Sequence, residues 1–276
     1  MNKKIGLILA LVLVAFLVMG TASAGLFDFL GGNDSGNATT NDENTFIVGF
    51  DAEFPPYGFK DDSGNYTGFD LDLAKEVCER NNWTFVPQPI DWDAKDAEID
   101  SGSIDCIWNG FTIDGRENDY TWSDPYFDNK QVFIVKSDSG ISSIDDLKGK
   151  TVETQKDSSA LAALQGDNKT IADTFGTLTE VADYNTAFMD LESGACDAIA
   201  MDIGVGEYDI KNKDNPDDYQ VLDQFITTEK YGIGFKKGND DLKNQVQDTL
   251  NEMFKDGTVA KIAEKYGISQ DALIQP

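Results

Sequence analysis

From Thr45 onward, short apolar runs alternate with segments whose apolar residues recur at helical spacing. The short runs predict strands and the periodic segments predict helices. In the first predicted helix, Phe69, Leu73 and Val77 recur every four residues and share one face, while acidic residues occupy the other. This first set comprises strands at 45–50, 84–88 and 105–109, and helices at 69–80 and 94–101. Strands that alternate with helices indicate βαβ units and a largely parallel sheet covered on both faces.

The same alternation begins again after an apolar strand predicted at Gln131–Lys136. The second set comprises a turn and strand at 147–155, strands at 197–201 and 231–237, helices at 158–164, 186–191 and 203–210, and two C-terminal helices. Two α/β units joined by two extended crossings indicate two lobes with a hinge rather than one continuous sheet.

The N-terminus has the pattern of a secretory signal peptide at residues 1–24. Asn2, Lys3 and Lys4 precede an apolar run that ends at Met19, and small residues follow at 22–24. An uncleaved membrane anchor is the alternative, although the run is short against the ~20 residues needed to span a bilayer. Residues 25–44 are rich in Gly, Asn, Asp and Thr and predict a flexible linker.

The chain carries 22 basic and 50 acidic residues, a formal net charge of −28. Such a surface repels nucleic acid and anionic lipid headgroups, so neither is expected as a partner. The charge says little about a small ligand, because acidic surfaces commonly serve solubility.

Three cysteines and the absence of histidine limit the chemistry. Cys78, Cys106 and Cys196 are scattered along the chain, and we expect them to be buried thiols, with a Cys78–Cys106 bridge as the alternative. Without histidine, His-based catalytic triads and the usual zinc sites are excluded. No metal and no cofactor is therefore expected.

Several loops with polar residues follow predicted strands. An open parallel sheet binds ligands outside the carboxyl ends of its strands, so these loops should lie close together. Arg116, one of only two arginines against 20 lysines, suits bidentate recognition of a carboxylate. Ser158 and Ser159 open a predicted helix whose N–H groups attract an anion, and Asp202 could accept an ammonium. Together these groups would suit a zwitterionic amino acid.

A series of short segments, in this order, resembles the polar amino-acid family of extracytoplasmic solute-binding proteins, the ligand receptors of ABC importers. The segments are GFDAEFPPYGFKDDSGNYTGFDLDLAKEV, IDCIWNGFTIDGR, TWSDPY, TQKDSSA and DAIAMD, within about Thr45 to Tyr266. The resemblance implies an α/β, two-lobed periplasmic-binding-protein fold, each lobe a mostly parallel sheet flanked by helices, with two hinge strands. It places lobe I at 45–134 plus 231–276, and lobe II at 135–230.

The same resemblance implies roles for individual residues. Arg116, Thr112 and Ser159 match positions that hold the α-carboxylate, and Asp202 and the Gly110 backbone match those that hold the α-ammonium. The expected ligand-binding set is Asp51, Phe54, Trp92, Asn109, Gly110, Thr112, Arg116, Ser158, Ser159 and Asp202. Phe54 and Trp92 match positions that pack on either side of the ligand, and Asp51 one that can meet a polar side-chain end. Thr112 and Arg116 are four positions apart where the family commonly has five, so the turn between them is shortened.

Each assignment has a structural alternative. Phe54 and Trp92 could be core aromatics, and Trp108 is expected to be core. Asp202 could cap the following helix, and Arg116 could pair on the surface with Glu117 or Asp119.

The resemblance implies a receptor that closes its lobes on an amino acid and delivers it to a membrane permease, without catalysis. We expect an exported monomer, periplasmic or extracellular and associated with the cell surface. Carboxylates at Asp51, Glu53 and Asp96 near the expected side-chain end favour Arg, Lys, ornithine, His or Gln as the ligand. A signalling-only amino-acid sensor and a prephenate-type dehydratase on the same fold are the alternatives.

Overall fold

The computed structural model describes residues 44–275. The signal-peptide prediction for 1–24, and the linker prediction for 25–44 apart from Asn44, therefore lie outside the described residues. No helix among residues 44–275 is long and apolar enough to cross a membrane.

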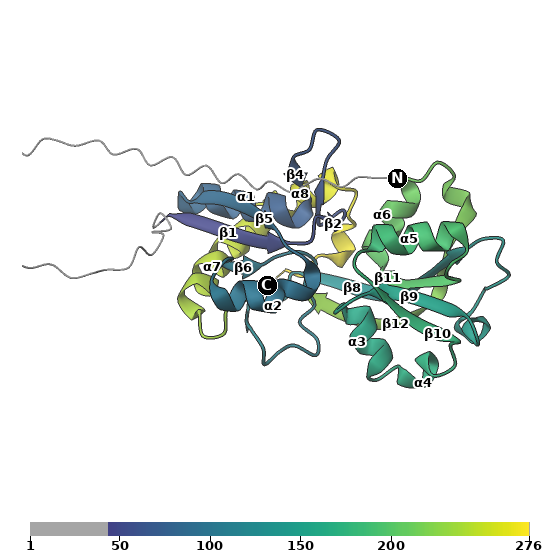
Figure 1. The fold of residues 1–276 in the computed structure, drawn as a ribbon. Helices are drawn as coiled ribbons and strands as arrows, with labels where there is room; N and C mark the ends of the chain where they lie inside the picture. The colour runs from purple at the N-terminus through teal and green to yellow at the C-terminus, as the bar shows by residue number, and fades with distance from the viewer. Residues whose placement is uncertain (1–43, 276) are drawn as a thin grey trace, which may run out of the picture. The chain divides into compact units, whose positions relative to one another are not determined.

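The first five-stranded sheet is mixed. Its order is β5 (Thr84–Pro89), β1 (Thr45–Phe50), β6 (Cys106–Ile107), β13 (Gly234–Phe235) and β7 (Thr121–Trp122). β1 runs parallel to both β5 and β6, whereas β13 runs antiparallel to its two neighbours. Three helices pack against this sheet, namely α1 (Phe69–Asn81), α2 (Lys95–Ser101) and α7 (Asp240–Lys255), and α8 (Thr258–Lys265) packs against α1 and α7 (Figure 1).

The second five-stranded sheet is also mixed, with three parallel strands at one side. Its order is β10 (Thr177–Val181), β9 (Thr151–Gln155), β11 (Ala198–Asp202), β8 (Phe127–Lys136) and β12 (Tyr219–Tyr231). β10, β9 and β11 are parallel, and β8 is antiparallel to β11 and β12. Its helices are α3 (Ser159–Gln165), α4 (Lys169–Ala172), α5 (Tyr184–Ser193) and α6 (Ile203–Lys211). A small third sheet is formed by β2 (Glu53–Phe54), β3 (Gly58–Lys60) and β4 (Tyr66–Thr67).

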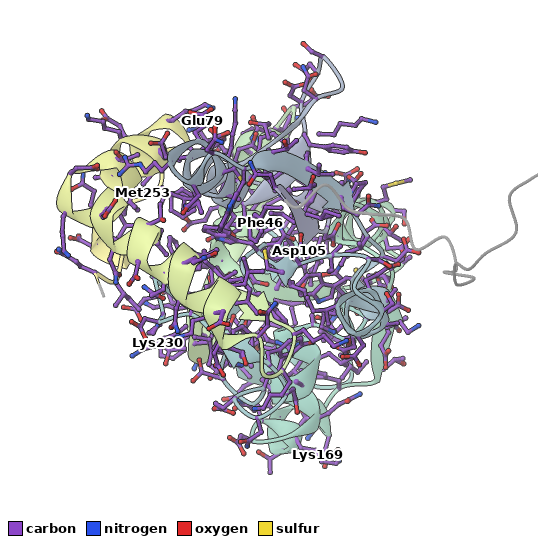
Figure 2. All side chains as sticks on the ribbon, turned by 90° about the vertical axis from the view of Figure 1, so that its left-hand side faces the viewer. Phe46, Glu79, Asp105, Lys169, Lys230 and Met253 are labelled. Carbon is purple, nitrogen blue, oxygen red and sulfur yellow. The ribbon has the colours of Figure 1, made fainter. Side chains whose placement is uncertain are left out.

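Aromatic side chains fill the region where the chain passes between the two large sheets. Phe127, at the start of β8, stacks on Tyr231, at the end of β12, with ring centroids 5.4 Å apart. Tyr57 meets both rings edge-on. These residues belong to one buried cluster that extends into both sheets. In Figure 2, Phe46 and Met253 lie within the packed interior and Lys169 extends from the surface.

Most predicted elements match the structure to within a few residues, but one predicted strand is wrong, and β10, β12 and several elements of two to four residues were not predicted. The strand predicted at 231–237 is wrong, because only Gly234–Phe235 pairs there and Tyr231 ends β12. β12 itself was missed. Register shifts between Val221 and Thr227 interrupt its alternation, so the sequence lacks the period of two that marks a strand.

The three cysteines are free and buried, which confirms the expectation of reduced thiols over a Cys78–Cys106 bridge. Trp108 is fully buried, as expected of a core residue.

Candidate ligand-binding site

A small cavity lies where loops from both large sheets meet. Its lining residues are Phe54, Trp92, Asn109, Gly110, Thr112, Arg116, Gln155, Ser158, Ser159 and Asp202. Nine of these ten were expected from the sequence, either because they follow predicted strands or open the next helix, or because the family resemblance implied them.

The Arg116 guanidinium is held by hydrogen bonds to backbone carbonyls rather than by ion pairs with carboxylates. Its Nη1 donates to the Thr112 carbonyl (3.3 Å), its Nη2 donates to the Asp157 carbonyl (3.1 Å), and Cζ lies 5.3 Å from the Phe111 ring centre. Within residues 44–275 it forms no ion pair, whereas Arg80 pairs with Glu76 and Asp256. The alternative of a surface pair with Glu117 or Asp119 is therefore wrong, and the guanidinium charge remains available to an anion.

The shortened turn before Arg116 is closed by a glycine and by a side-chain contact. Gly115 adopts a φ of 81°, a conformation that glycine enters without strain. The Asp114 carboxylate accepts a hydrogen bond from the Lys230 N–H (2.7 Å). These two features keep Arg116 at the cavity despite the missing residue.

The start of α3 supplies the serine groups. Ser158 is the N-cap, and its Oγ accepts from the Leu161 N–H (3.1 Å). Ser159 is the first helical residue, so its N–H has no partner within the helix. Because α3 has only seven residues, the polar groups that it offers to the cavity are the individual N–H and hydroxyl groups of Ser158 and Ser159 rather than a helix dipole.

Asp202 provides a buried negative charge at the cavity. Although it occupies the N-cap position of α6, its side chain makes no capping hydrogen bond. Its Oδ1 instead accepts from Asn129 Nδ2 (2.6 Å) and the Tyr231 hydroxyl (2.5 Å). The helix-cap alternative is wrong for this side chain. Burial and the neighbouring Glu229 carboxylate raise the pKa of Asp202 to about 7.

The aromatic residues divide between the cavity and the core. Phe54 is 6% exposed, packs near Tyr57 and lines the cavity, as does the half-buried Trp92. Gly110 has a φ of 55°, and a Cβ there would come within 2.8 Å of Phe54 Cε1. The Gly110 N–H donates to Asp70 Oδ2 (2.6 Å), which fixes the orientation of the Asn109–Gly110 peptide group.

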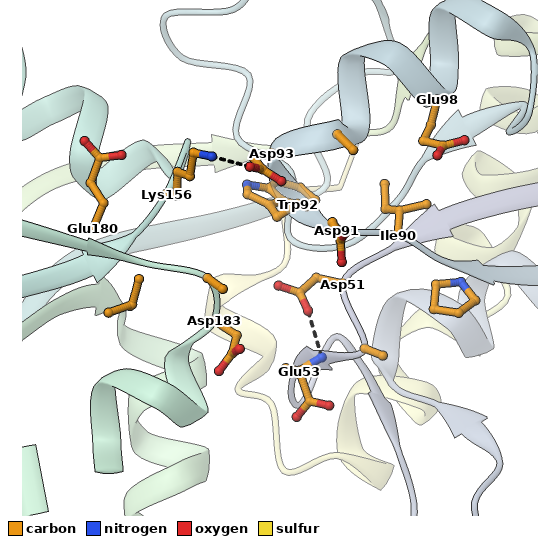
Figure 3. Close-up of a pocket in the computed structure, with 15 residues that line it drawn as sticks. Asp51, Glu53, Ile90, Asp91, Trp92, Asp93, Glu98, Lys156, Glu180 and Asp183 are labelled. Carbon is orange, nitrogen blue, oxygen red and sulfur yellow. Dashed lines mark hydrogen bonds and ion pairs between the residues drawn. The ribbon is translucent and has the colours of Figure 1, made fainter. Parts of the chain in front are cut away.

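Asp51 does not line this cavity but an acidic groove beside it (Figure 3). Its carboxylate accepts from Gln155 Nε2 (2.6 Å) and the Glu53 N–H (2.8 Å), and burial raises its pKa to about 6. The other charged residues of the groove are Glu53, Asp91, Asp93, Glu98, Lys156, Glu180 and Asp183. The expectation that Asp96 lies near is wrong, because Asp96 accepts from the Tyr120 hydroxyl and lines a different hollow.

Polar contacts join loops of the first sheet to loops of the second around the cavity. The pairs are Lys95 with Asp157, Lys156 with Asp93 (2.5 Å), Arg116 with the Asp157 carbonyl, Gln155 with Asp51, and Asn185 with Glu53. A group bound in the cavity would therefore touch residues of both sheets.

Four polar residues near the site were not predicted. Gln155 is the last residue of the strand predicted at 147–155, so its position at the carboxyl end of that strand could have indicated a site residue. Asn129, Gln131 and Glu229 are buried in β8 and β12 and form a hydrogen-bonded group behind Thr112 and Ser159. Nothing in the sequence indicated that Glu229 lies near the site, because its strand β12 was not predicted.

Buried carboxyl groups predict an unusual dependence of stability on pH. Burial raises the pKa of Asp51 to about 6 and those of Asp70, Asp202 and Asp209 to about 7. Between about pH 4 and 7 the native state then binds more protons than the unfolded state, so these groups make stability fall as pH rises through that window. We expect the ligand-free protein to melt several degrees higher at about pH 5.5 than at pH 8.

Differential scanning calorimetry at the two pH values measures this difference. Asp209→Asn, which alters a group that does not line the cavity, should reduce it. An equal or lower melting temperature at the acidic pH would contradict the prediction.

A guanidinium free of ion pairs and a buried carboxylate on one cavity, between two α/β sheets, define a two-lobed binding protein. The chain matches the model of bacterial extracellular solute-binding proteins, family 3, over residues 46–269, and it belongs to this family. The resemblance inferred from the sequence and the two-lobed α/β fold are thereby confirmed, although each large sheet is mixed rather than mostly parallel.

Individual relatives are similar over most of their length. The L-cystine-binding protein TcyJ of Escherichia coli (strain K12) is 32% identical over 229 residues, which cover 80% of this chain and 82% of TcyJ. A probable histidine-binding protein of Neisseria gonorrhoeae is 31% identical over 244 residues, with 85% and 87% covered. The crystal structure of an ABC uptake transporter substrate-binding protein from Streptococcus pneumoniae with bound histidine has a TM-score of 0.80 and 32% identity. It matches 83% of this chain and 94% of that one.

Proposed function

We propose that this protein is the amino-acid receptor of an ABC importer and binds a free α-amino acid in the cavity. The observation that carries the proposal is the presence of Arg116 and Asp202 on one small cavity. A zwitterion needs a cation for its carboxylate and an anion for its ammonium, and these two side chains supply both. An affinity in the micromolar range, roughly −8 kcal/mol, is within reach of two such contacts with aromatic packing.

The bound amino acid is polar or cationic at its side chain. Gln155 joins the cavity to Asp51, and the groove beyond Asp51 carries several carboxylates but only one lysine, Lys156, which pairs with Asp93. Relatives named for binding cystine, histidine and arginine agree with this charge pattern.

The receptor acts by closing two lobes on its ligand. Lobe I comprises 45–134 plus 231–276 and lobe II comprises 135–230, so the chain crosses between the lobes along β8 and at the end of β12, which pair with each other. A ligand that contacts both lobes favours the closed form by the difference between its interactions in the two states. The closed monomer then delivers the amino acid to a membrane permease outside the cytoplasm.

The activity is binding without bond-making. The relatives described above are named as binding proteins. An ancestral amino-acid-binding protein described as a precursor of cyclohexadienyl dehydratase is 32% identical, with a TM-score of 0.73, so the fold is compatible with an enzyme. We expect no turnover of prephenate, measured by its ultraviolet absorbance.

A thermal-shift screen of residues 45–276 against the common amino acids, ornithine, citrulline and cystine tests the proposal. A ligand at 100 times its dissociation constant adds about 2.7 kcal/mol of stability, which raises the melting temperature by several degrees. We expect a shift from one or a few polar or cationic amino acids. A folded, ligand-free preparation that responds to none of them would contradict the proposed function.

A further inference from the structure

Glu229 is a buried carboxylate directly behind the cavity. Its residue is 4% exposed and does not line the cavity. Its Oε1 accepts from the Thr112 hydroxyl (3.0 Å), Asn129 Nδ2 (2.8 Å) and Gln131 Nε2 (2.8 Å), and its Oε2 accepts from the Ser159 hydroxyl (2.8 Å). No lysine or arginine of residues 44–275 forms a salt bridge with it. Glu229 therefore contacts two residues that line the cavity, Thr112 in the loop after β6 and Ser159 at the start of α3.

The protons of this group can be counted. A hydroxyl has one proton and two lone pairs, and an amide NH₂ has two protons. Gln131 Nε2 donates one proton to Ser159 Oγ (2.9 Å) and the other to Glu229, while Asn129 Nδ2 donates to Asp202 and Glu229. Because Thr112 and Ser159 give their only hydroxyl protons to Glu229, neither hydroxyl has a proton left for the cavity.

We propose that Glu229 is a positioning residue that makes the Thr112 and Ser159 hydroxyls hydrogen-bond acceptors toward the ligand. This inference rests on the proposed function and specifies how its site distinguishes ammonium from carboxylate. The free lone pairs favour an N–H of the ligand, so the carboxylate is bound by Arg116 and by backbone N–H groups. The Thr112 N–H has no acceptor within the part of the chain that the structure describes, which leaves it available.

Glu229→Gln tests the proposal because the network dictates how a glutamine must lie. Its oxygen has to replace Oε1, which receives the N–H groups of Asn129 and Gln131, so its NH₂ replaces Oε2 and donates to Ser159 Oγ. Ser159 would then accept two hydrogen bonds, and its own proton would turn to the cavity as a donor. The variant thus changes the Ser159 hydroxyl from a hydrogen-bond acceptor to a donor toward the cavity, and it removes the negative charge of Glu229.

The experiment compares two ligands by titration calorimetry. One is the amino acid that gives the largest shift in the thermal screen, and the other is the same molecule without its α-amino group, such as 5-guanidinopentanoate for L-arginine. With Glu229→Gln we expect about ten-fold weaker binding of the amino acid and about three-fold tighter binding of the desamino acid. In a Ser159→Ala background the gain for the desamino acid should vanish, because its donor is gone.

Glu264→Gln, which changes an exposed glutamate on α8, is the matched charge control and should alter neither affinity. Equal weakening of both ligands by Glu229→Gln would indicate a merely structural role and would overturn the inference, as would a desamino gain that survives in Ser159→Ala. If the wild-type protein binds no amino acid at all, the proposed function fails first, and this inference fails with it.

Discussion

Replacing Arg116 by alanine is expected to weaken amino-acid binding at least about thirty-fold while the protein remains folded. Removing one member of a buried, hydrogen-bonded charge pair costs about 2–5 kcal/mol, because the ligand carboxylate is left without its partner. The fold should tolerate the change, since the guanidinium bonds only to the carbonyls of Thr112 and Asp157. Titration calorimetry gives the affinity, and the melting temperature reports on folding.

Two further variants separate the geometry of the guanidinium from its charge and control for the loss of an arginine. Arg116→Lys keeps the charge but loses the planar pair of donors, so it should fall between the wild-type protein and the alanine variant. Arg80→Ala removes the other arginine, whose partners Glu76 and Asp256 lie on the surface, and should leave binding unchanged. A folded Arg116→Ala protein with wild-type affinity would remove Arg116 from carboxylate recognition.

The arrangement of the cavity was largely predictable because its residues follow elements with strong local patterns. β1 and β11 are largely apolar runs, and β9 is a short segment with β-branched residues. The ends of these strands and the segments after them contribute Phe54, Ser158, Ser159 and Asp202. Since parallel strands end at the same edge of a sheet, recognising β9 and β11 was enough to bring Ser158, Ser159 and Asp202 together, whereas Phe54 lies at the edge of the other sheet.

The buried group around Glu229 was not predictable for a physical reason. Asn129, Gln131 and Glu229 are polar residues buried within β8 and β12, where a period of two predicts apolar ones. Their burial is stabilised by mutual hydrogen bonds, which depend on tertiary pairing between strands about 100 residues apart. The position of Asp51 outside the cavity was likewise not predictable. Gln155 lies between Asp51 and the cavity, and its side-chain amide donates a hydrogen bond to the Asp51 carboxylate.

Replacing Asp202 by asparagine is expected to weaken amino-acid binding by a few kcal/mol near pH 8, because it removes the negative charge that faces the ligand ammonium. The asparagine can still occupy the space between Asn129 and Tyr231, and the native side chain does not cap α6, so the melting temperature should change little. Unchanged affinity in a folded variant would assign the ammonium to other acceptors.

The pH dependence of binding separates this role from a structural one. The pKa of Asp202 is about 7 in the ligand-free protein, and the carboxylates and hydroxyls that face it are those of Glu229, Tyr57, Tyr184 and Tyr231. An ammonium binds the ionised carboxylate, so below about pH 7 the competent fraction falls and affinity should drop roughly ten-fold per pH unit. Asp202→Asn has no such proton to lose, and its weaker affinity should be nearly constant between about pH 5 and 8. If wild type and variant shared the same pH profile, the acid-induced loss would have to come from another group, and Asp202 would not be the acceptor of the ammonium.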